Sequence, residues 1–263
     1  MSGPIGELEN IYTHSVTPKA HTSVQDKGET ELYWYFAYGS NLNNETFLVR
    51  RGIRPFRQLR LLVPGWRLNF QIAGIPYAEP GFGSIDRFSS ADSELEKSQP
   101  VLHGMAYLIS SKDYWHIIAT EGGDSSYRQI QVQAIDPLTK EEHKVWTLQA
   151  VRPRKDCQPS LRYITIIRQG AREHNFPQEY LEYLDSVEPF ILKGKRQKIG
   201  AALFIGFFMP IITWIFALRA LLTKENGEGP AWLSAFARIV FKTAWSIHDK
   251  VWADKFGRGD HNA

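Results

Sequence analysis

The feature that most constrains this chain is a run of twenty residues without a charge, from Ile199 to Leu218. At 1.5 Å per residue such a run makes a helix of about 30 Å, the thickness of the hydrocarbon core of a bilayer. Pro210 lies in the middle of the run, and proline is tolerated in membrane helices better than in soluble ones. The run therefore predicts a transmembrane helix, whose apolar continuation extends to Leu222.

The charges around this run indicate where the rest of the chain lies. Four cations, in the segment Lys193-Gly-Lys195-Arg196-Gln-Lys198, stand immediately before it, and the positive-inside rule places the preceding residues in the cytosol. Residues 193–263 hold 11 Lys or Arg against 5 Asp or Glu, whereas the first 192 residues hold 20 against 23. A basic tail of this kind indicates an anionic partner, either phospholipid or nucleic acid, and the adjacent apolar run favours phospholipid.

Two other interpretations of the run stay open. The first alternative is the buried core helix of a soluble helical hairpin. The second is a re-entrant hairpin, bent at Pro210, that enters and leaves the same leaflet. After the break Gly227-Glu-Gly229-Pro230, apolar side chains recur on one helical face, opposite three cations. This face consists of Trp232, Leu233, Phe236, Ile239, Val240, Ile247 and Val251, opposite Arg238, Lys242 and Lys250. Such a pattern predicts an amphipathic helix at an interface.

The rest of the chain has the pattern of a mixed α+β domain. Residues 1–29 lack apolar periodicity and predict a flexible leader without a secretory signal, and residues 30–192 hold the globular domain. The basic stop and hydrophobic segment occupy residues 193–222, and the amphipathic tail 223–263. Strands are predicted over Leu32 to Tyr38, Val63 to Ala73, Val101 to Ile109, Tyr127 to Ile135 and Lys144 to Val151, and helices over Lys112 to Thr120, Ser160 to His174 and Pro177 to Ser186.

The first 192 residues lack the signatures of metal and nucleotide chemistry. The eight histidines of the chain form no HxxxH or HExxH pair, and the single Cys157 cannot build a zinc site. Neither a GxGxxG motif, a P-loop nor a GxSxG elbow occurs. A cluster of arginines is interpreted as a solvated basic face, because the RNA-binding signature is missing; it comprises Arg50, Arg51, Arg54, Arg57 and Arg60. Neither a metal nor a nucleic-acid partner is therefore expected.

Two local features carry candidate chemistry. A predicted strand ends in the turn Gly39-Ser40-Asn41, whose backbone N–H groups are able to hold a carboxylate or an oxyanion, although such residues also make ordinary surface turns. Glu121 closes a predicted helix whose apolar side chains provide surroundings of the kind that raise a carboxyl pKa toward values useful for a general base. A helix-terminal glutamate exposed to water is the alternative, since glycines follow it.

In three places the residues resemble the gamma-glutamylcyclotransferase family. The segment Tyr35-Phe36-Ala37-Tyr38-Gly39-Ser40-Asn41-Leu42 is similar to the family's substrate loop, and Glu121-Gly122 with Tyr127 is similar to its catalytic-glutamate segment. A third block, from Pro159-Ser160 through Tyr163 to Glu188-Pro189, is similar to its final helical segment. The blocks follow the family's order over roughly residues 33–192. The resemblance implies an α+β fold, a small mixed β-barrel with flanking helices and the active pocket at its mouth.

The reaction that the resemblance implies needs no cofactor. The alpha-amine of a gamma-glutamyl compound attacks the side-chain carbonyl, forms the five-membered ring of 5-oxoproline and expels an amine. Glu121 is the implied general base and acid. The implied substrate-binding residues are Tyr35, Phe36, Ala37, Tyr38, Gly39, Ser40, Asn41 and Tyr163. A membrane-tethered module that binds gamma-glutamyl compounds without catalysis is the competing hypothesis.

The chain also differs from the simple cytosolic members of this family. The Asn41-Leu42 form of the loop resembles the branch that accepts gamma-glutamyl amino acids. Compared with the simple cytosolic members, this chain differs in its leader, in an insertion-like stretch from Tyr77 to Gln99 and in its C-terminal extension. Extended proteins of this kind resemble fungal enzymes of gliotoxin-type biosynthesis, which remove gamma-glutamyl groups from glutathione conjugates of a diketopiperazine. The implied protein is a membrane-associated cyclotransferase that faces the cytosol and acts on a gamma-glutamyl amino acid, peptide or glutathione S-conjugate.

Overall fold

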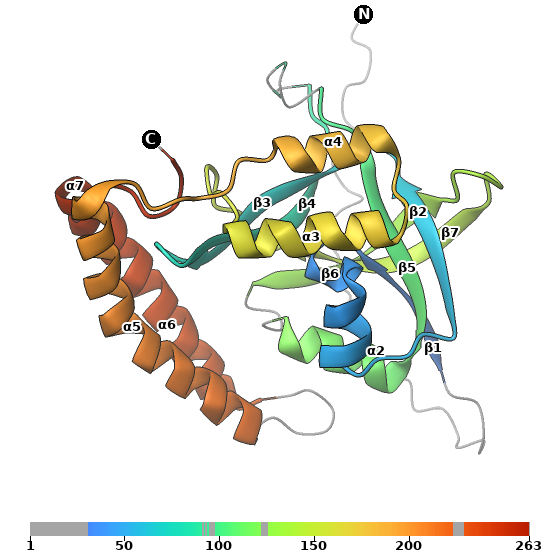
Figure 1. The fold of residues 1–263 in the computed structure, drawn as a ribbon. Helices are drawn as coiled ribbons and strands as arrows, with labels where there is room; N and C mark the ends of the chain where they lie inside the picture. Colours follow the sequence, from blue (N-terminus) through green and yellow to red (C-terminus); the bar gives the residue numbers. More distant parts are fainter. Residues whose placement is uncertain are drawn as a thin grey trace, which may run out of the picture. The chain divides into compact units, whose positions relative to one another are not determined.

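A computed structural model describes residues 31–90, 92, 94, 98–121, 126–222 and 229–262, so the predicted leader lies outside the described residues. Figure 1 shows the arrangement of the elements. In chain order they are β1 (Leu32–Ala37), η1 (Ser40–Leu42), η2 (Glu45–Arg50), β2 (Arg57–Val63), β3 (Trp66–Ile75), β4 (Glu79–Arg87), β5 (Leu102–Ser110), α2 (Ser111–Thr120), β6 (Tyr127–Ile135), β7 (Glu142–Ala150), α3 (Leu161–Glu173), α4 (Gln178–Ser186), α5 (Gly194–Leu222), α6 (Ala231–Ile247), η4 (His248–Trp252) and α7 (Ala253–Phe256).

Five of the described strands close into a barrel in the order β1-β5-β2-β6-β7. β5 pairs antiparallel with β1 and with β2, and β6 pairs antiparallel with β7. A parallel contact between Tyr35 and Trp146 closes the ring between β1 and β7. Large side chains such as Phe36, Leu61 and Tyr107 are fully buried inside the fold. The predicted α+β barrel with flanking helices is confirmed.

The two-stranded ribbon of β3 and β4 departs from the predicted strands. The prediction of a single strand from Val63 to Ala73 is wrong, because a turn at Pro64 and Gly65 divides this stretch between β2 and β3. Gly65 has a φ of 75° in this turn. β4 falls in the stretch interpreted as an insertion, where Gly81 and Gly83 interrupt the alternation of large apolar residues. A Cβ at Gly81 would lie 2.7 Å from a backbone carbonyl oxygen of β3, so this glycine permits close approach of the chain.

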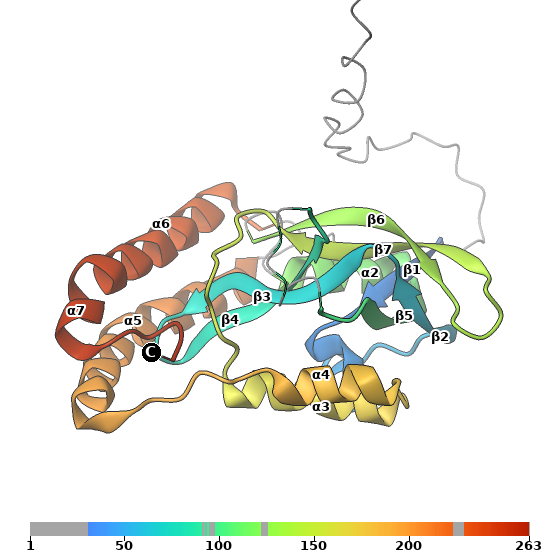
Figure 2. The same cartoon turned by 90° about the horizontal axis from the view of Figure 1, so that it is seen from above.

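Helices α2, α3 and α4 pack against the barrel, and Figure 2 shows α3 and α4 running side by side. The Ser110 side chain caps α2 by accepting a hydrogen bond from the Asp113 N–H, and Ser160 caps α3 in the same way. α3 lies directly against η1 because Gly170 has no side chain. A Cβ at Gly170 would lie 2.5 Å from the carbonyl carbon of Leu42.

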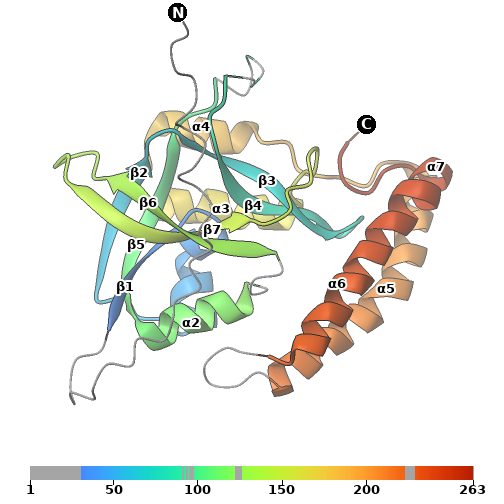
Figure 3. The same ribbon diagram turned by 180° about the vertical axis from the view of Figure 1, so that it is seen from behind.

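α5 and α6 form a helical hairpin, which Figure 3 shows at one end of the β3–β4 ribbon. α5 is long and apolar enough to cross a membrane. Within its most apolar stretch, 28% is buried against the rest of the protein. The predicted hydrophobic and amphipathic helices are both present. The predicted apolar face of α6 is divided, however, since Leu233 is buried while Trp232 and Ile239 stay exposed.

The residues after α7 return to the barrel domain. The Trp245 indole N–H donates to the Gly74 carbonyl at 3.0 Å, which joins α6 to β3. Beyond α7, the Gly259 carbonyl accepts the Tyr77 N–H at 2.7 Å, in the turn between β3 and β4. The two helices are therefore fastened to the ribbon from both α6 and the last residues of the chain.

A cluster of ion pairs stabilises this return. The Asp260 side chain is 1% exposed and accepts hydrogen bonds from Arg258 at 2.6 Å and from Arg154 at 3.0 Å. Burial acts to raise the pKa of Asp260, but the two guanidinium groups outweigh it and lower the pKa to about 2. Because this pKa is lower than the ordinary value of 3.8, the ion pairs contribute stability above about pH 4 and lose it as the pH falls toward 2.

We predict that Asp260→Asn lowers the free energy of unfolding at pH 7 by about 2 kcal/mol, since it removes the charge that pairs with two partly buried arginines. Denaturant unfolding followed by tryptophan fluorescence measures the change. Asp185→Asn is the matched control, because Asp185 and its partner Arg172 are 48% and 50% exposed, and the expected change is below about 1 kcal/mol. The difference between Asp260→Asn and the parent should shrink below about pH 4. A difference that does not depend on pH would contradict the ion-pair account.

Candidate active site

The turn after β1 is a buried and well-connected element. The Tyr38 hydroxyl donates to the Leu148 carbonyl at 2.6 Å, and Asn41 is 4% exposed. The His174 ring, whose pKa is lowered by burial, lies with Nε2 2.9 Å from the Leu42 carbonyl and so donates a hydrogen bond to it. The ordinary surface turn considered from the sequence is therefore excluded, and these residues are held at one end of the barrel.

Glu121 lies at the end of α2, where its N–H donates to the Ile117 carbonyl at 3.0 Å. Its side chain is 21% exposed, so the alternative of a glutamate in open water is wrong. The Asn41 amide donates to Oε1 of Glu121 at 3.3 Å, and the Arg51 guanidinium forms an ion pair with the same oxygen. The structure thus brings together the loop residue and the carboxylate, which are 80 residues apart in the chain.

Arg51 does not belong to a solvated basic face. Its side chain is 16% exposed, whereas that of its neighbour Arg50 is 66% exposed. Its Nε donates to Oδ1 of Asn41 at 2.7 Å, and its other guanidinium nitrogens reach Thr120 and Glu121. Sequence reasoning missed this role because the arginines of the cluster are alike locally. The π-helical turn η2, which directs Arg51 toward Glu121, has no distinct sequence signal.

Four tyrosines lie near enough to Glu121 for its charge to act on their phenols. Tyr35, Tyr38 and Tyr163 are buried and Tyr127 is half-buried. Burial is the main cause that raises the pKa of each phenol, and the negative charge of Glu121 adds to it. All four hydroxyl groups therefore keep their protons at neutral pH and serve as hydrogen-bond donors.

β4 contributes its backbone to this group at Gly83. The Gly83 N–H donates to the Tyr163 hydroxyl at 3.0 Å, and its carbonyl accepts from the Tyr127 hydroxyl at 2.9 Å. A Cβ at Gly39 would lie 3.0 Å from the same Tyr163 oxygen, and Ser40 beside it is half-buried. Gly83 and Tyr127 are not among the predicted binding residues. Gly83 offers no side-chain signal, and only the resemblance of its segment indicated Tyr127.

Phe36 and Ala37, two of the predicted binding residues, lie in the barrel wall. The Phe36 ring is fully buried, and a Cβ at Gly104 on β5 would lie 2.4 Å from it. Ala37 pairs with Met105 on the same strand and is 1% exposed. Tyr35, in contrast, accepts a hydrogen bond from Asn41 through its hydroxyl at 2.9 Å. Alternate residues of a strand point to opposite faces, which accounts for the difference between Tyr35 and Phe36.

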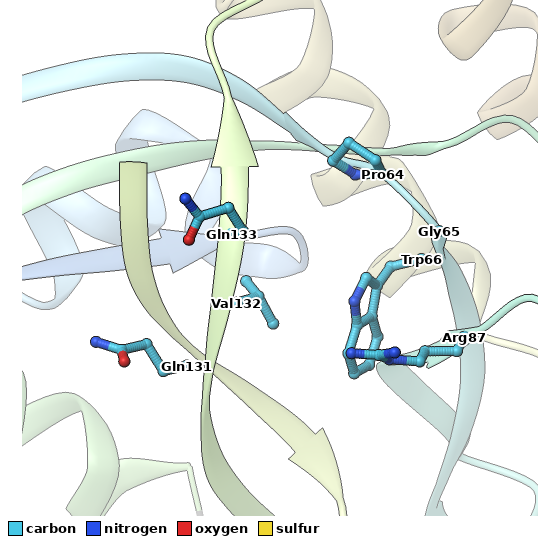
Figure 4. A pocket seen from close by; sticks show the side chains of 7 residues that line it. All are labelled: Pro64, Gly65, Trp66, Arg87, Gln131, Val132 and Gln133. Atoms are coloured by element: carbon cyan, nitrogen blue, oxygen red, sulfur yellow. The ribbon is translucent and has the colours of Figure 1, made fainter. Parts of the chain in front are cut away.

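Two surface hollows lie elsewhere among the described residues. The first, of about 200 Å³, separates the β2–β3 turn from β6, and Figure 4 shows Arg87 against the Trp66 ring, 5.2 Å from its centre. None of its lining residues carries a carboxylate. The second, of about 450 Å³, lies between η2 and α3 and includes Glu173, whose carboxylate already accepts hydrogen bonds from Asn43 and Asn44. Neither of these two hollows includes Glu121. The candidate active site is identified instead by the hydrogen bond and the ion pair that converge on the Glu121 carboxylate.

Among the described residues, His248, Asp249 and Asp260 have ligand atoms close enough together to share a metal ion. Nε2 of His248 accepts the Gly259 N–H at 2.8 Å, and Nδ1 lies 2.9 Å from the Asp249 carboxylate. The carboxylate of Asp260 binds two guanidinium groups. These contacts already use the ligand atoms, so the cluster is a structural part of the C-terminal return.

Comparison with known proteins identifies both parts of the chain. Residues 101–184 match the AIG2-like family, and residues 194–254 match the AclK C-terminal domain. The chain is 36% identical to the gamma-glutamyl cyclotransferase aclK of Aspergillus oryzae, over 87% of this chain and 90% of that protein. It belongs to the gamma-glutamyl cyclotransferase family. The family relationship predicted from the three sequence blocks is thereby confirmed, and so is the class of enzyme.

Other gamma-glutamyl cyclotransferases support the assignment. The chain is 33% identical to gliK of Aspergillus fumigatus, over 86% of this chain and 89% of gliK. A solved structure of a gamma-glutamyl cyclotransferase superposes with a TM-score of 0.51 at 25% identity. It covers 63% of this chain, while 93% of the solved chain is matched. The barrel is thus a cyclotransferase fold, to which this chain adds further segments.

We predict that Tyr163→Phe reduces turnover of gamma-glutamyl-alanine by about tenfold or more, because it removes a hydroxyl donor beside Glu121. Tyr183→Phe is the matched control: its hydroxyl donates to the Leu68 carbonyl at 3.1 Å, away from the carboxylate. Each variant loses one hydrogen bond between a phenol and the backbone, so each should lose about 1 kcal/mol of stability. Release of 5-oxoproline and thermal unfolding are the measurements. Equal turnover by the two variants would exclude a role for Tyr163 in the reaction.

Proposed function

We propose that Glu121 is the general base and general acid of a cyclisation that releases 5-oxoproline. The observation that supports the proposal is the setting of the Glu121 carboxylate. It forms an ion pair with Arg51, accepts a hydrogen bond from Asn41 and lies among protonated phenols. The ion pair and the hydrogen bond hold the carboxylate in one orientation, as a positioned general base requires. Both described hydrogen bonds fall on Oε1, so Oε2 is the oxygen that exchanges protons with the substrate.

The proposed reaction balances without an external reagent. Oε2 of Glu121 takes a proton from the alpha-ammonium group of the gamma-glutamyl compound, and the freed amine attacks the side-chain carbonyl carbon. A C–N bond forms within the ring while the C–N bond to the departing amine breaks. The carboxylic acid returns this proton to the departing amine. The carboxylate then takes the second proton of the ring nitrogen and passes it to the same amine, so that the products are the neutral lactam of 5-oxoproline and an ammonium group. Because the nucleophile belongs to the substrate, binding of the folded conformer supplies the effective concentration that the attack requires, on the order of 10⁵ M or more.

The turn after β1 is the proposed binding site for the substrate carboxylate or the oxyanion. Its backbone hydrogen bonds start with the Leu42 N–H, which donates to the Gly39 carbonyl at 3.0 Å. The N–H groups of Ser40 and Asn41 stand at the start of this helical turn, where donors lack an acceptor within the helix. Together with the Tyr163 hydroxyl they provide donors for a negative charge. Gly39 keeps this approach open because it has no side chain.

We predict that Glu121→Gln keeps the fold and reduces release of 5-oxoproline by about a hundredfold or more, since an amide cannot relay the proton. Glu179→Gln, at an exposed position in α4, is the matched control and should retain full turnover. Circular dichroism and thermal unfolding check the fold. The competing hypothesis of a non-catalytic binding module requires instead that the parent protein bind gamma-glutamyl compounds and release no 5-oxoproline. Retained turnover by Glu121→Gln would refute the proposed base.

We propose further that the substrate is a glutathione S-conjugate, in the manner of fungal enzymes that process a glutathione-conjugated diketopiperazine. Support comes from the relationship to aclK and gliK and from the C-terminal extension that the chain shares with the AclK domain. Gamma-glutamyl amino acids and peptides carry the same reacting group and are the simpler alternative substrates.

A panel of gamma-glutamyl-alanine, glutathione and an aromatic glutathione S-conjugate separates these substrates. The expected result is that kcat/KM for the conjugate exceeds that for glutathione by about tenfold or more, because burial of an aromatic group contributes roughly 1.5–3 kcal/mol. Release of 5-oxoproline is the measurement for all three. Equal kcat/KM with and without the S-substituent would contradict the tailoring role and leave the cyclotransferase activity intact.

We also propose that the chain is membrane-associated, with phospholipid bound through residues 199–222 and the barrel in the cytosol. The length and apolar composition of α5 and the four cations within Lys193–Lys198 support this location.

A further inference from the structure

α5 has two apolar faces, and the protein covers one of them. The inner row is at most 5% exposed and consists of Ala201, Phe204, Phe208, Ile212 and Ile215. The outer row is between 55% and 81% exposed and consists of Ile199, Leu203, Phe207, Trp214 and Leu221. The spacing of four or seven residues within the outer row keeps its side chains on one side of the helix. An exposed apolar row of this length indicates a surface that meets another apolar phase.

α6 continues the exposed apolar surface beside α5. Trp232, Phe236 and Ile239 are 56%, 38% and 61% exposed. The rings of Trp214 and Phe236 lie edge to face, with their centres 6.3 Å apart, so the surface is continuous between the helices. We call the outer row of α5 together with these three residues the hairpin surface.

The charges next to the hairpin surface are all of one sign within the two helices. α5 and α6 contain no Asp or Glu, and their cations are Lys195, Arg196, Lys198, Arg219, Arg238 and Lys242. Arg238 and Lys242 are exposed and lie roughly a third of a turn around α6 from the Trp232, Phe236 and Ile239 row. Large aromatic side chains edged by Lys and Arg are the composition that binds anionic phospholipid at an interface. A protein partner would have to supply acidic groups and a long apolar groove together.

Both ends of the hairpin lie on the side of the barrel. The Trp252 indole N–H donates to the Gly200 carbonyl at 2.9 Å, which joins η4 to the beginning of α5. Beyond α7, the Asn262 amide donates to the Pro189 carbonyl at 2.9 Å, just before α5. The chain therefore returns to the place from which α5 departs. A single crossing by α5 would separate these groups by the thickness of the membrane.

A double crossing by the hairpin also conflicts with the contacts of α6. Its 17 residues make a helix of about 25 Å, and Trp245 near its end is bonded to β3. Insertion across a bilayer would therefore draw the polar ribbon toward the hydrocarbon. It would also place the exposed Arg238 and Lys242 at membrane depth, where charged side chains are costly.

We infer that the α5–α6 hairpin lies in the plane of one anionic leaflet, with the hairpin surface in the lipid and neither helix crossing the bilayer. This inference rests on the proposed membrane association and specifies its mode. The barrel then sits at the membrane surface, fastened by the β3–β4 ribbon.

Flotation of the full-length protein with phosphatidylcholine vesicles, with and without phosphatidylserine, tests the surface. Binding should be about tenfold or more stronger with phosphatidylserine and should weaken in high salt. Phe207→Asp should weaken binding by about tenfold or more, because Phe207 is 65% exposed on the outer row. Leu138→Asp, at an apolar position that is 80% exposed in the β6–β7 turn, is the matched control and should bind as the parent does. Both variants should release 5-oxoproline at the parent rate, which verifies their fold.

Failure has distinct forms in this assay. Absence of parent binding to either vesicle would overturn both the inference and the proposed membrane association, while continued release of 5-oxoproline would leave the proposed catalytic role standing. Self-association that Phe207→Asp abolishes, without lipid binding, would assign the hairpin surface to a second copy of the chain and overturn the inference.

A single-cysteine protein distinguishes the in-plane mode from crossing. The variant Ala231→Cys with Cys157→Ser carries its only thiol at the exposed start of α6. In sealed membranes that present their cytosolic side, an impermeant maleimide should label this thiol without detergent. Protection that detergent removes would show that α5 crosses, which overturns the in-plane mode and leaves membrane association intact.

Discussion

The candidate active site depends on keeping one carboxylate, Glu121, where water has little access. A carboxylate in such a position is stable only with a counter-charge and hydrogen-bond donors, which Arg51 and Asn41 provide. Both partners come from the segment after β1, so the barrel must bring the end of β1 to the end of α2. The phenols around the site keep their protons because burial raises the pKa of each. The phenols therefore keep hydrogen atoms to donate, as the Tyr38 and Tyr127 hydroxyls do to backbone carbonyls.

The β3–β4 ribbon connects this site with the C-terminal hairpin. At Gly83 its backbone bonds two of the tyrosines near Glu121, while at Tyr77 and Gly74 it bonds the last residues of the chain and α6. One short ribbon thus forms part of the site at one end and carries the hairpin at the other. The AclK-type C-terminal helices are consequently hydrogen-bonded to the same ribbon that contributes Gly83 to the candidate site.

Elements with a regular apolar period could be predicted from the sequence, and relations between distant residues could not. β1, β5, β6, β7 and the helices α2 to α4 follow the predicted segments within a few residues, because their alternation or helical spacing is local. β4 was missed since its glycines, required by close approach of the chain, remove the alternation. Arg51 was missed since its partner lies 70 residues away and neighbouring arginines have the same local setting. The Gly39-Ser40-Asn41 turn and Glu121 were candidates on local chemical grounds, whereas Tyr35 to Tyr38 and the specific roles of all these residues were indicated only by the resemblance to a family.

Pro210 shows why hydropathy alone does not determine how α5 meets a membrane. A proline has no N–H, so the carbonyl of Gly206, four residues earlier, loses its partner within the helix. Both Gly206 and Pro210 lie on the exposed side of α5. In a helix that crosses the bilayer this carbonyl would face hydrocarbon, where an unbonded polar group is expensive. In a helix that lies in the plane of a leaflet, near the boundary between headgroups and acyl chains, this carbonyl is closer to water than it would be at the bilayer centre. The proline that makes a long apolar run resemble a membrane helix therefore also favours a position at the interface.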